Sequence, residues 1–298
     1  MSWEPAVSVC VPTWNGAAYL ATCLDSLLSQ SFGEFEILLV DDGSSDASLE
    51  IAAGVRDARL TIHQNPRRLG LPGNWNRCLE LARGRLVKFL FQDDSLAPAA
   101  LEALLGALDR PSGPVLSFCR REIRHEGSPL LAPVLGQAYF AHLAQFYESV
   151  SPEVTGLDLV LAWPRAGRPL STNVVGEPSF VLFEREAARA VGGFDTRFVQ
   201  LADWDLWLRL ARRAPLAFVD QVLGVFRIHA RGVSARNFGQ PRLQRDHLLL
   251  LGKLAREYGP LLPVEVRKKL RLARWHAGYH WVKESALAAL KGRRPAIA

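Results

Sequence analysis

The 298-residue sequence has no apolar run near the roughly 18 residues that a membrane-spanning helix requires. Its first five residues lack a basic start and an apolar stretch, so we expect no secretory signal. The four cysteines show no metal-ligand spacing and suit reduced thiols in a cytoplasmic protein. Repeats, a P-loop and a glycine-rich dinucleotide fingerprint are also missing. These absences argue against a membrane-spanning protein, a disulfide-rich secreted protein and a P-loop enzyme.

The formal net charge of +6 is unevenly distributed along the chain. Residues 241–298 hold 13 Lys/Arg and 4 Asp/Glu, whereas residues 1–240 are slightly acidic. A basic tail suggests an anionic partner. Because no nucleic-acid recognition motif is present, we expect no nucleic-acid partner and favour an anionic membrane surface. The protein would then be cytoplasmic and peripheral on the inner face of the membrane.

The first 110 residues alternate short apolar runs with helical patterns. Four runs suit buried strands: Val7–Val11, Phe35–Val40, Leu60–His63 and Leu86–Phe91. Helical spacing lies between and after them, at 17–28, just after 46, at 74–82 and after Pro98. This alternation predicts an α/β fold with a mostly parallel central sheet and helices on both faces.

The pattern changes after residue 110. We expect an exposed strand at Val115–Ile123, loops over 126–172 with a helix near 138–148, and a buried strand at Ser179–Phe183. A helix at Asp203–Arg212 and a strand at Leu216–Ile228, broken by Gly224, would follow. From about residue 240 the pattern is helical to residue 291. We predict one domain over 1–235 and a basic helical C-terminal extension over 236–298.

Polar clusters stand at the ends of three predicted strands, at Thr13–Asn15, Asp41–Asp46 and Gln92–Asp94. Ligands of parallel sheets bind at the carboxyl ends of strands. Adjacent carboxylates repel and are costly to bury without a cation. Mn²⁺ and Mg²⁺ prefer oxygen ligands and often bind carboxylates together with substrate phosphates. A solvated turn explains either Asp-Asp pair alone, but two pairs on one sheet favour a divalent metal site.

The ordered motifs resemble those of the family 2 glycosyltransferases, whose GT-A fold is a single Rossmann-like domain. The resemblance covers residues 7–234 and rests on six segments: 7–16, 29–32, 40–46, 92–94, 192–195 and 203–209. It implies inverting transfer of a sugar from a nucleotide diphosphate sugar, with UDP or dTDP favoured, to an acceptor hydroxyl. The acceptor would be a saccharide or lipid-linked saccharide in bacterial surface polysaccharide or glycolipid assembly.

The resemblance also implies roles for single residues. Nucleotide contacts are expected from Pro12, Thr13, Trp14, Asn15, Asp42 and Asp93. Trp14 would stack on the base, Asp42 would accept an N–H of a pyrimidine, and Asp93 would bind ribose or the donor sugar. Packing in the core is the alternative for Trp14.

The metal and the acceptor are assigned to a further group of residues. Asp94 would be the main ligand of a Mn²⁺ or Mg²⁺ cofactor, and Asp203 would be the catalytic base. His229 would be a second metal ligand or a phosphate contact, or else a structural residue. Further acceptor or phosphate contacts are expected from Glu177, Arg231 and Ser234. A plain turn before a strand is the alternative for Glu177.

Three positions depart from the family pattern: Gln92 replaces an Asp, Ala202 replaces a Glu before the base, and Trp75 stands about where an Arg is common. They keep open a catalytically impaired, nucleotide-sugar-binding relic. A nucleotidyltransferase is another alternative, but it would need a basic glycine-rich loop after the first strand.

The tail predicts one helix over 264–291. Its apolar residues recur at three- and four-residue steps: Val266, Leu270, Ala273, Ala277 and Trp281. Basic residues crowd its first half: Arg267, Lys268, Arg271 and Arg274. The helix would pack on the catalytic domain, dock on an anionic bilayer that carries a lipid-linked acceptor, or do both.

Overall fold

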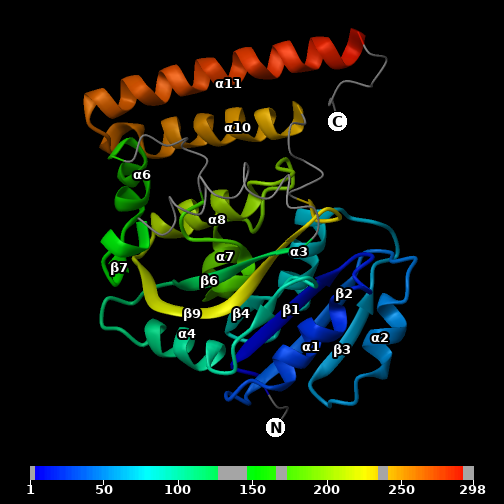
Figure 1. Cartoon of the computed structure of the whole chain (residues 1–298). Helices are drawn as coiled ribbons and strands as arrows, with labels where there is room; N and C mark the ends of the chain where they lie inside the picture. Colours follow the sequence, from blue (N-terminus) through cyan, green and yellow to red (C-terminus); the bar gives the residue numbers. More distant parts are fainter. Residues whose placement is uncertain (1–3, 127–145, 166–172, 234–240, 291–298) are drawn as a thin grey trace.

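The computed structural model describes residues 4–126, 146–165, 173–233 and 241–290. Its core is a nine-stranded sheet in the order β3-β2-β1-β4-β8-β6-β9-β5, with β7 paired to β9 (Figure 1). The longer ladders are parallel, so the sheet is mostly parallel, as predicted.

The first four strands form the parallel half of the sheet. β1 (Val7–Thr13) lies between β2 (Phe35–Asp41) and β4 (Leu86–Phe89), and β3 (Leu60–Gln64) lies outside β2. β1, β2 and β4 are buried along their whole length, which explains their nearly unbroken apolar sequences. The predicted strands of this half are confirmed.

The other strands form a mixed half. β8 (Val181–Glu184) is antiparallel to β4 and β6 (Leu116–Glu126), and β6 is parallel to β9 (Leu216–His229). The short strands β5 (Ser95–Leu96) and β7 (Glu153–Val154) pair antiparallel with β9.

Two predictions for this half were wrong. Gly224 does not break β9, because it pairs with Leu96 in register; a Cβ on it would lie 2.5 Å from the Ser95 carbonyl oxygen. Glycine therefore lets β5 approach rather than ending the strand. β6 was expected to be exposed, but its first four residues are buried because β8 and β9 flank them.

Helices cover both faces of the sheet, as predicted. One apolar core lies under α1 (Leu20–Leu28), α2 (Ser48–Gly54) and α4 (Ala100–Leu108). The second lies under α3, α6, α7, α8, α10 and α11. These helices span Leu71–Leu81, Gly156–Arg165, Arg185–Ala190, Ala202–Ala211, Pro241–Glu257 and Val264–Leu290, and short 3₁₀ turns span Pro178–Phe180 and Gly259–Leu261. α6 was not predicted, and most of the helix expected near 138–148 lies outside the described residues.

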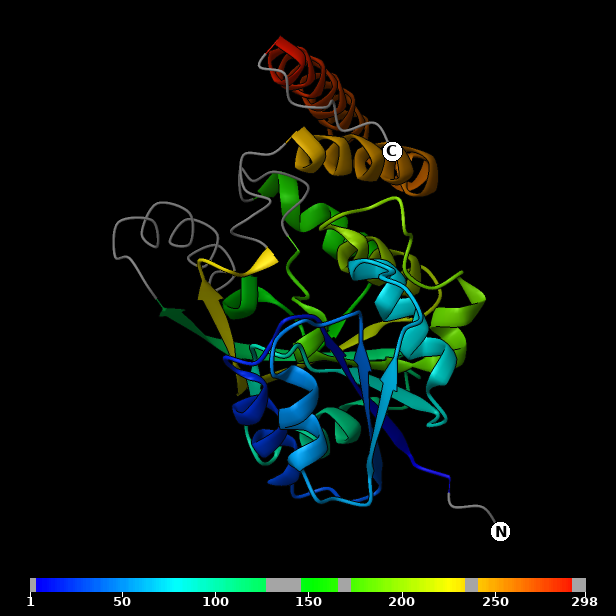
Figure 2. The ribbon, with the colours of Figure 1, turned by 90° about the vertical axis from the view of Figure 1, so that its right-hand side faces the viewer.

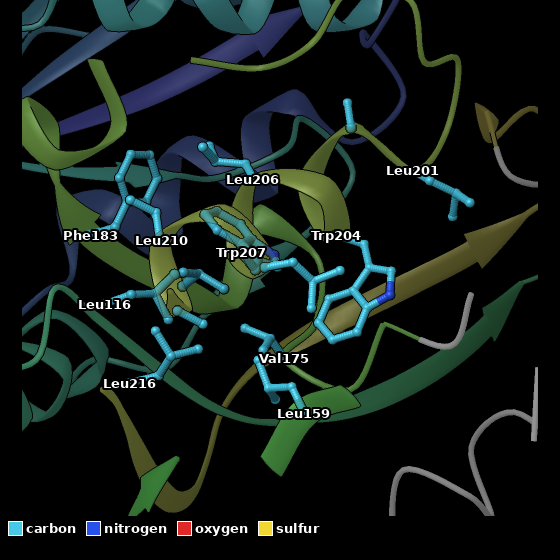
Figure 3. Close-up of a cluster of buried hydrophobic side chains, with 14 of the residues drawn as sticks. Leu116, Leu159, Val175, Phe183, Leu201, Trp204, Leu206, Trp207, Leu210 and Leu216 are labelled. Atoms are coloured by element: carbon cyan, nitrogen blue, oxygen red, sulfur yellow. The ribbon is translucent and has the colours of Figure 1, made fainter. Parts of the chain in front are cut away.

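The C-terminal helices belong to the second core. α8 presents Trp204 and Trp207 to this core (Figure 3), and Leu250, Leu254 and Tyr258 of α10 pack into the same cluster. α11 lies along α10 on the side away from the sheet (Figures 1 and 2). The boundary at 235/236 stays a prediction, because it falls within residues 234–240, which lie outside the described part of the chain. None of the described helices has the length and apolarity to cross a membrane.

Candidate active site

The end of β1 forms one wall of the site. The Trp14 N–H donates to Gln92 Oε1 at 2.8 Å, and Gln92 Nε2 donates back to the Trp14 carbonyl at 3.1 Å. An Asp at position 92 could not donate the hydrogen bond to the Trp14 carbonyl, so the structure explains why an amide stands here. A Cβ on Gly16 would lie 2.3 Å from Gln92 Oε1, so the close approach of this backbone to the Gln92 side chain requires glycine.

The loop after β1 is held against the loop after β2. Asn15 has a φ of +50°, and its Oδ1 accepts the Ser45 N–H at 2.8 Å, while its own N–H donates to Ser44 Oγ at 2.9 Å. Pro12 and Thr13 are buried in β1. The half-buried Trp14 ring carries the Arg68 guanidinium 3.6 Å from its centroid, a close cation–π contact. The loops thus present a fixed, flat aromatic surface.

The carboxylate of Asp42 is largely satisfied within the protein. Its Oδ1 accepts from Asn65 Nδ2 at 2.9 Å and from the Leu69 N–H at 2.7 Å, and its Oδ2 accepts from the Gly70 N–H at 2.9 Å. Asp42 therefore holds the segment before α3 that carries Arg68. Its predicted contact with a pyrimidine base stays a prediction.

Asp93 and Asp94 face different partners, as expected for successive residues. His229 Nε2 lies 3.0 Å from Asp93 Oδ2, because β9 runs past this corner of the sheet. Asp94 is buried, its Oδ1 accepts the Arg227 N–H at 3.1 Å, and its Oδ2 has no partner among the described residues. Burial, reinforced by the Asp93 charge, holds the pKa of Asp94 well above its usual range. His229 is thus paired with Asp93.

These groups fit part of a divalent-metal site. No cluster of three or more His, Cys, Asp or Glu poised to hold a metal occurs within the described residues. Asp93, which is paired with His229, and the Asp94 oxygen that has no hydrogen-bond partner among the described residues supply two carboxylates. Mg²⁺ and Mn²⁺ commonly take one or two carboxylates from the protein and complete their shell with phosphate and water. The donor set therefore fits such an ion bound together with a diphosphate.

Asp203 opens α8 on the other side of the site. Its Oδ1 accepts the Trp204 N–H at 2.7 Å, and its Oδ2 accepts Asn173 Nδ2 at 3.0 Å. Burial, with a smaller contribution from the negative charge of Glu177, raises the pKa of Asp203 to about 7. A carboxylate with such a pKa is suited to accept a proton near neutral pH. Asn173 was missed by the sequence analysis, because a single Asn in a loop carries no distinguishing pattern.

Glu177 links the two sides electrostatically. Its negative charge raises the pKa of Asp94 as well as that of Asp203, so Glu177 lies close enough to influence both carboxylates. Arg121 of β6 holds it through an ion pair of 2.7 Å and contacts Tyr147 Oη at 2.5 Å. The expected contact of Glu177 with the acceptor or a phosphate stays a prediction. Arg231 is exposed just after β9, and Ser234 lies outside the described residues.

A buried lysine lies beneath the carboxylates. Lys88 Nζ donates to the Phe89 carbonyl at 2.9 Å and to the Ser179 carbonyl, and Ser179 Oγ accepts the Phe91 N–H at 3.0 Å. Burial lowers the pKa of Lys88 to about 7. These bonds join the end of β4 to the turn that follows Glu177.

Helix α10 holds the segment that leads into α8. Asp246, which is fully buried, accepts the N–H groups of Val199, Gln200 and Leu201 on one oxygen at 2.9, 2.7 and 3.2 Å. Lys253, two turns further along α10, bridges Asp195 at 3.1 Å and Asp205 of α8. The sequence analysis missed both residues, because they lie outside the motif-bearing region.

Comparisons with known sequences agree with this architecture. The model of Glycosyl transferase family 2 matches residues 8–133. An uncharacterized protein of Mycobacterium tuberculosis is 35% identical over 90% of this chain and 81% of its own length. An uncharacterized glycosyltransferase of Rickettsia typhi is 27% identical over 76% of this chain and 65% of its own. A PGL/p-HBAD biosynthesis glycosyltransferase of M. tuberculosis is 42% identical, over 35% of this chain and 41% of its own.

Two solved structures share the fold. TarS of S. aureus, residues 1–349 in complex with UDP-GlcNAc, has a TM-score of 0.68 at 18% identity, covering 92% of this chain and 72% of that one. The mannosyltransferase PcManGT from Pyrobaculum calidifontis, in complex with GDP-Man and Mn²⁺, has a TM-score of 0.62 at 21% identity, covering 99% and 78%. The fold is of the GT-A type. The chain belongs to the family 2 glycosyltransferases.

Proposed function

We propose that this protein is an inverting, metal-dependent glycosyltransferase that transfers a sugar from a nucleotide diphosphate sugar, UDP or dTDP favoured, to an acceptor hydroxyl. The observation that carries the proposal is Asp203, a buried carboxylate whose pKa is raised to about 7. The charge of Glu177 acts on Asp203 and also on Asp94, the neighbour of the Asp93–His229 pair. Direct displacement requires a proton acceptor and a group that stabilises the leaving diphosphate, and Asp203 and a divalent ion held at the Asp93–His229 corner would supply them.

In this mechanism Asp203 takes the proton of the acceptor hydroxyl as that oxygen attacks the anomeric carbon. Asn173 and the Trp204 N–H each donate to one carboxylate oxygen of Asp203 and so fix the orientation of this carboxylate. The Trp14 ring binds the base by stacking, displacing the Arg68 guanidinium. Asp93, His229 and the free oxygen of Asp94 would hold a divalent ion, which stabilises negative charge on the leaving diphosphate when bound.

The acceptor is proposed to be a saccharide or lipid-linked saccharide in surface polysaccharide or glycolipid assembly. The name of the mycobacterial PGL/p-HBAD biosynthesis relative supports a glycolipid setting. We place the protein in the cytoplasm, peripheral on the inner membrane face through its basic C-terminal helices. The charge of residues 241–298, 13 Lys/Arg against 4 Asp/Glu, supports this placement.

Thermal-shift titration with UDP, dTDP and GDP, each with Mn²⁺, Mg²⁺ or EDTA, tests the donor and the metal together. A ligand at 100 times its dissociation constant adds about 2.7 kcal/mol of apparent stability. We expect UDP or dTDP with Mn²⁺ to give the largest shift and EDTA to reduce it.

Two variants assign the metal ligands. If Asp94 is the main ligand, Asp94→Ala abolishes the metal-dependent part of the shift, and Asp93→Ala weakens it less. The reverse order would assign the ion to Asp93 and His229. A wild-type protein that binds no nucleotide diphosphate under any of these conditions would contradict the proposed function. Nucleotide binding without transfer or donor hydrolysis would identify a binding relic.

A further inference from the structure

Helix α11 is apolar on two opposite sides. Val266, Leu270 and Ala277 are buried against α10, which accounts for the apolar stripe seen in the sequence. Four further large side chains point away from α10, with exposed fractions of 58% for Leu272, 64% for Trp275, 54% for Tyr279 and 60% for Val282. Packing on α10 explains the first stripe and leaves the second uncovered.

The exposed residues form one continuous surface. Their spacing of three, four and three residues places them in a single row along the helix. The rings of Trp275 and Tyr279 stack at 6.0 Å with an interplanar angle of 14°. We call Leu272, Trp275, Tyr279 and Val282 the outer stripe. Large exposed apolar surfaces mark interaction sites in soluble proteins.

The charges beside the outer stripe identify its partner. Residues 264–283 contain six Lys/Arg and one Glu. Helical spacing places Lys268 in line with the stripe, one turn before Leu272, with Arg271 on one flank and Lys283 on the other. All three are exposed. A second copy of this helix would bring like charges together, whereas an anionic surface would neutralise them.

We propose that the outer stripe of α11 docks on an anionic lipid bilayer, with Leu272, Trp275, Tyr279 and Val282 at the boundary between the headgroups and the acyl chains. Amphipathic helices with basic flanks and aromatic rings bind bilayers in this orientation. This inference rests on the proposed function only for the identity of the acceptor. It assigns the proposed membrane contact to one face of α11 rather than to the basic tail as a whole.

The position of α11 fits this role. α11 is the outermost element of the molecule, and β1 and β2 run toward the end that carries it (Figures 1 and 2). The carboxyl ends of these strands bear Trp14 and Asp42. Docking through the outer stripe therefore turns the site-bearing end of the sheet toward the bilayer, where a lipid-linked acceptor would be presented.

Co-sedimentation of the full chain with vesicles tests the proposal. We expect wild-type protein to bind phosphatidylcholine vesicles that contain phosphatidylglycerol, to release at high salt, and to bind pure phosphatidylcholine poorly. The double variant Lys268→Glu/Arg271→Glu and the double variant Trp275→Ala/Tyr279→Ala should each lose about tenfold or more in vesicle affinity. The matched control Arg77→Glu/Arg85→Glu makes the same charge change on the catalytic domain and should lose much less.

Depth of insertion gives a second readout. Lipids brominated in their acyl chains should quench part of the tryptophan fluorescence of bound wild-type protein, and Trp275→Phe should lose this part while retaining binding. UDP binding by thermal shift should stay unchanged in every variant, which separates a failure of this proposal from a failure of the proposed function. Wild-type protein that ignores anionic vesicles at low salt would overturn the proposal. So would outer-stripe variants that bind like wild type, or self-association through the outer stripe without vesicle binding.

Discussion

The strand ends of the parallel half and the C-terminal helix pair contribute to the same site in different ways. In the first region, Trp14 and Asp42 follow directly after β1 and β2, and Asp93 lies a few residues after β4, so chain order and chemistry coincide. In the second region, α10 carries no recognisable motif, yet Asp246 accepts three consecutive N–H groups just ahead of Asp203. Motifs therefore mark the residues that would touch ligand, whereas the residues that hold them in place can lie in motif-free segments.

The largest effect is expected at Asp203, where the two regions meet. Asp203→Asn keeps the shape of the side chain but cannot accept a proton, so kcat should fall by about 10²-fold or more with donor affinity nearly unchanged. Steady-state kinetics and calorimetry measure the two quantities. Asp220→Asn, at an exposed acid of β9, is the matched control and should be neutral. Near-normal turnover in Asp203→Asn would remove Asp203 from the chemistry.

The pH profile of the wild-type enzyme tests the same assignment. Only the deprotonated carboxylate can act as a base, and burial raises the pKa of Asp203 to about 7. The value of kcat should therefore rise with pH through about 7 and level off above it. This acid limb should disappear in Asp203→Asn. Carboxylates with an ordinary pKa titrate at about pH 4, below this range. A wild-type profile that is flat between pH 5 and 8 would therefore contradict the assignment.

The next largest effect should come from α10. Asp246→Ala leaves three buried N–H groups without an acceptor and frees the segment before α8, so kcat should fall by about 10- to 100-fold through misplacement of Asp203. Asp246→Asn keeps one acceptor oxygen and should recover much of the loss. The acid limb of the Asp246→Ala pH profile should also move to lower pH, because greater exposure of Asp203 to water lowers its pKa.

A packing variant distinguishes positioning from general stability. Leu254→Ala removes a buried side chain of the same helix and should destabilise the protein by about 2–5 kcal/mol while leaving Asp246 in place. We expect its pH profile to match the wild type at temperatures where it is folded. Equal shifts of the acid limb in Leu254→Ala and Asp246→Ala would mean that α10 has only a structural role.

The smallest effect is expected at Trp14, which belongs to the strand ends of the parallel half. If the base stacks on the indole, Trp14→Ala should weaken nucleotide binding by about 1–3 kcal/mol. Calorimetry with UDP and Mn²⁺ measures the change. Trp275→Ala, at the exposed tryptophan of α11, is the control and should leave nucleotide affinity unaltered. Normal affinity in a folded Trp14→Ala protein would return Trp14 to a packing role.

Several features of the fold were predictable because they depend on local pattern. The continuous apolar runs of β1, β2 and β4 indicated strands buried on both faces, and the ordered motifs indicated the family. Gly224 was misinterpreted because a glycine in a strand signals either a break or a close approach, and only the pairing of β5 with β9 distinguishes them. The reason for a Trp at position 75, about where the family often has an Arg, also became clear only in the structure. The Trp75 ring stacks on Phe91 at 5.1 Å inside the core.

By itself, the sequence determined the alternation of strands and helices in the parallel half, the carboxylates at the strand ends and the basic character of the tail. Each of these features depends only on residues that are neighbours along the chain. Only the tertiary structure decided which of them meet. It paired His229 with Asp93, gave Asp203 its Asn173 partner, and seated Asp246 beneath the segment before α8. These contacts join residues 30 to 136 positions apart. The packing of whole helices and strands sets such contacts, and residue spacing along the chain does not encode them.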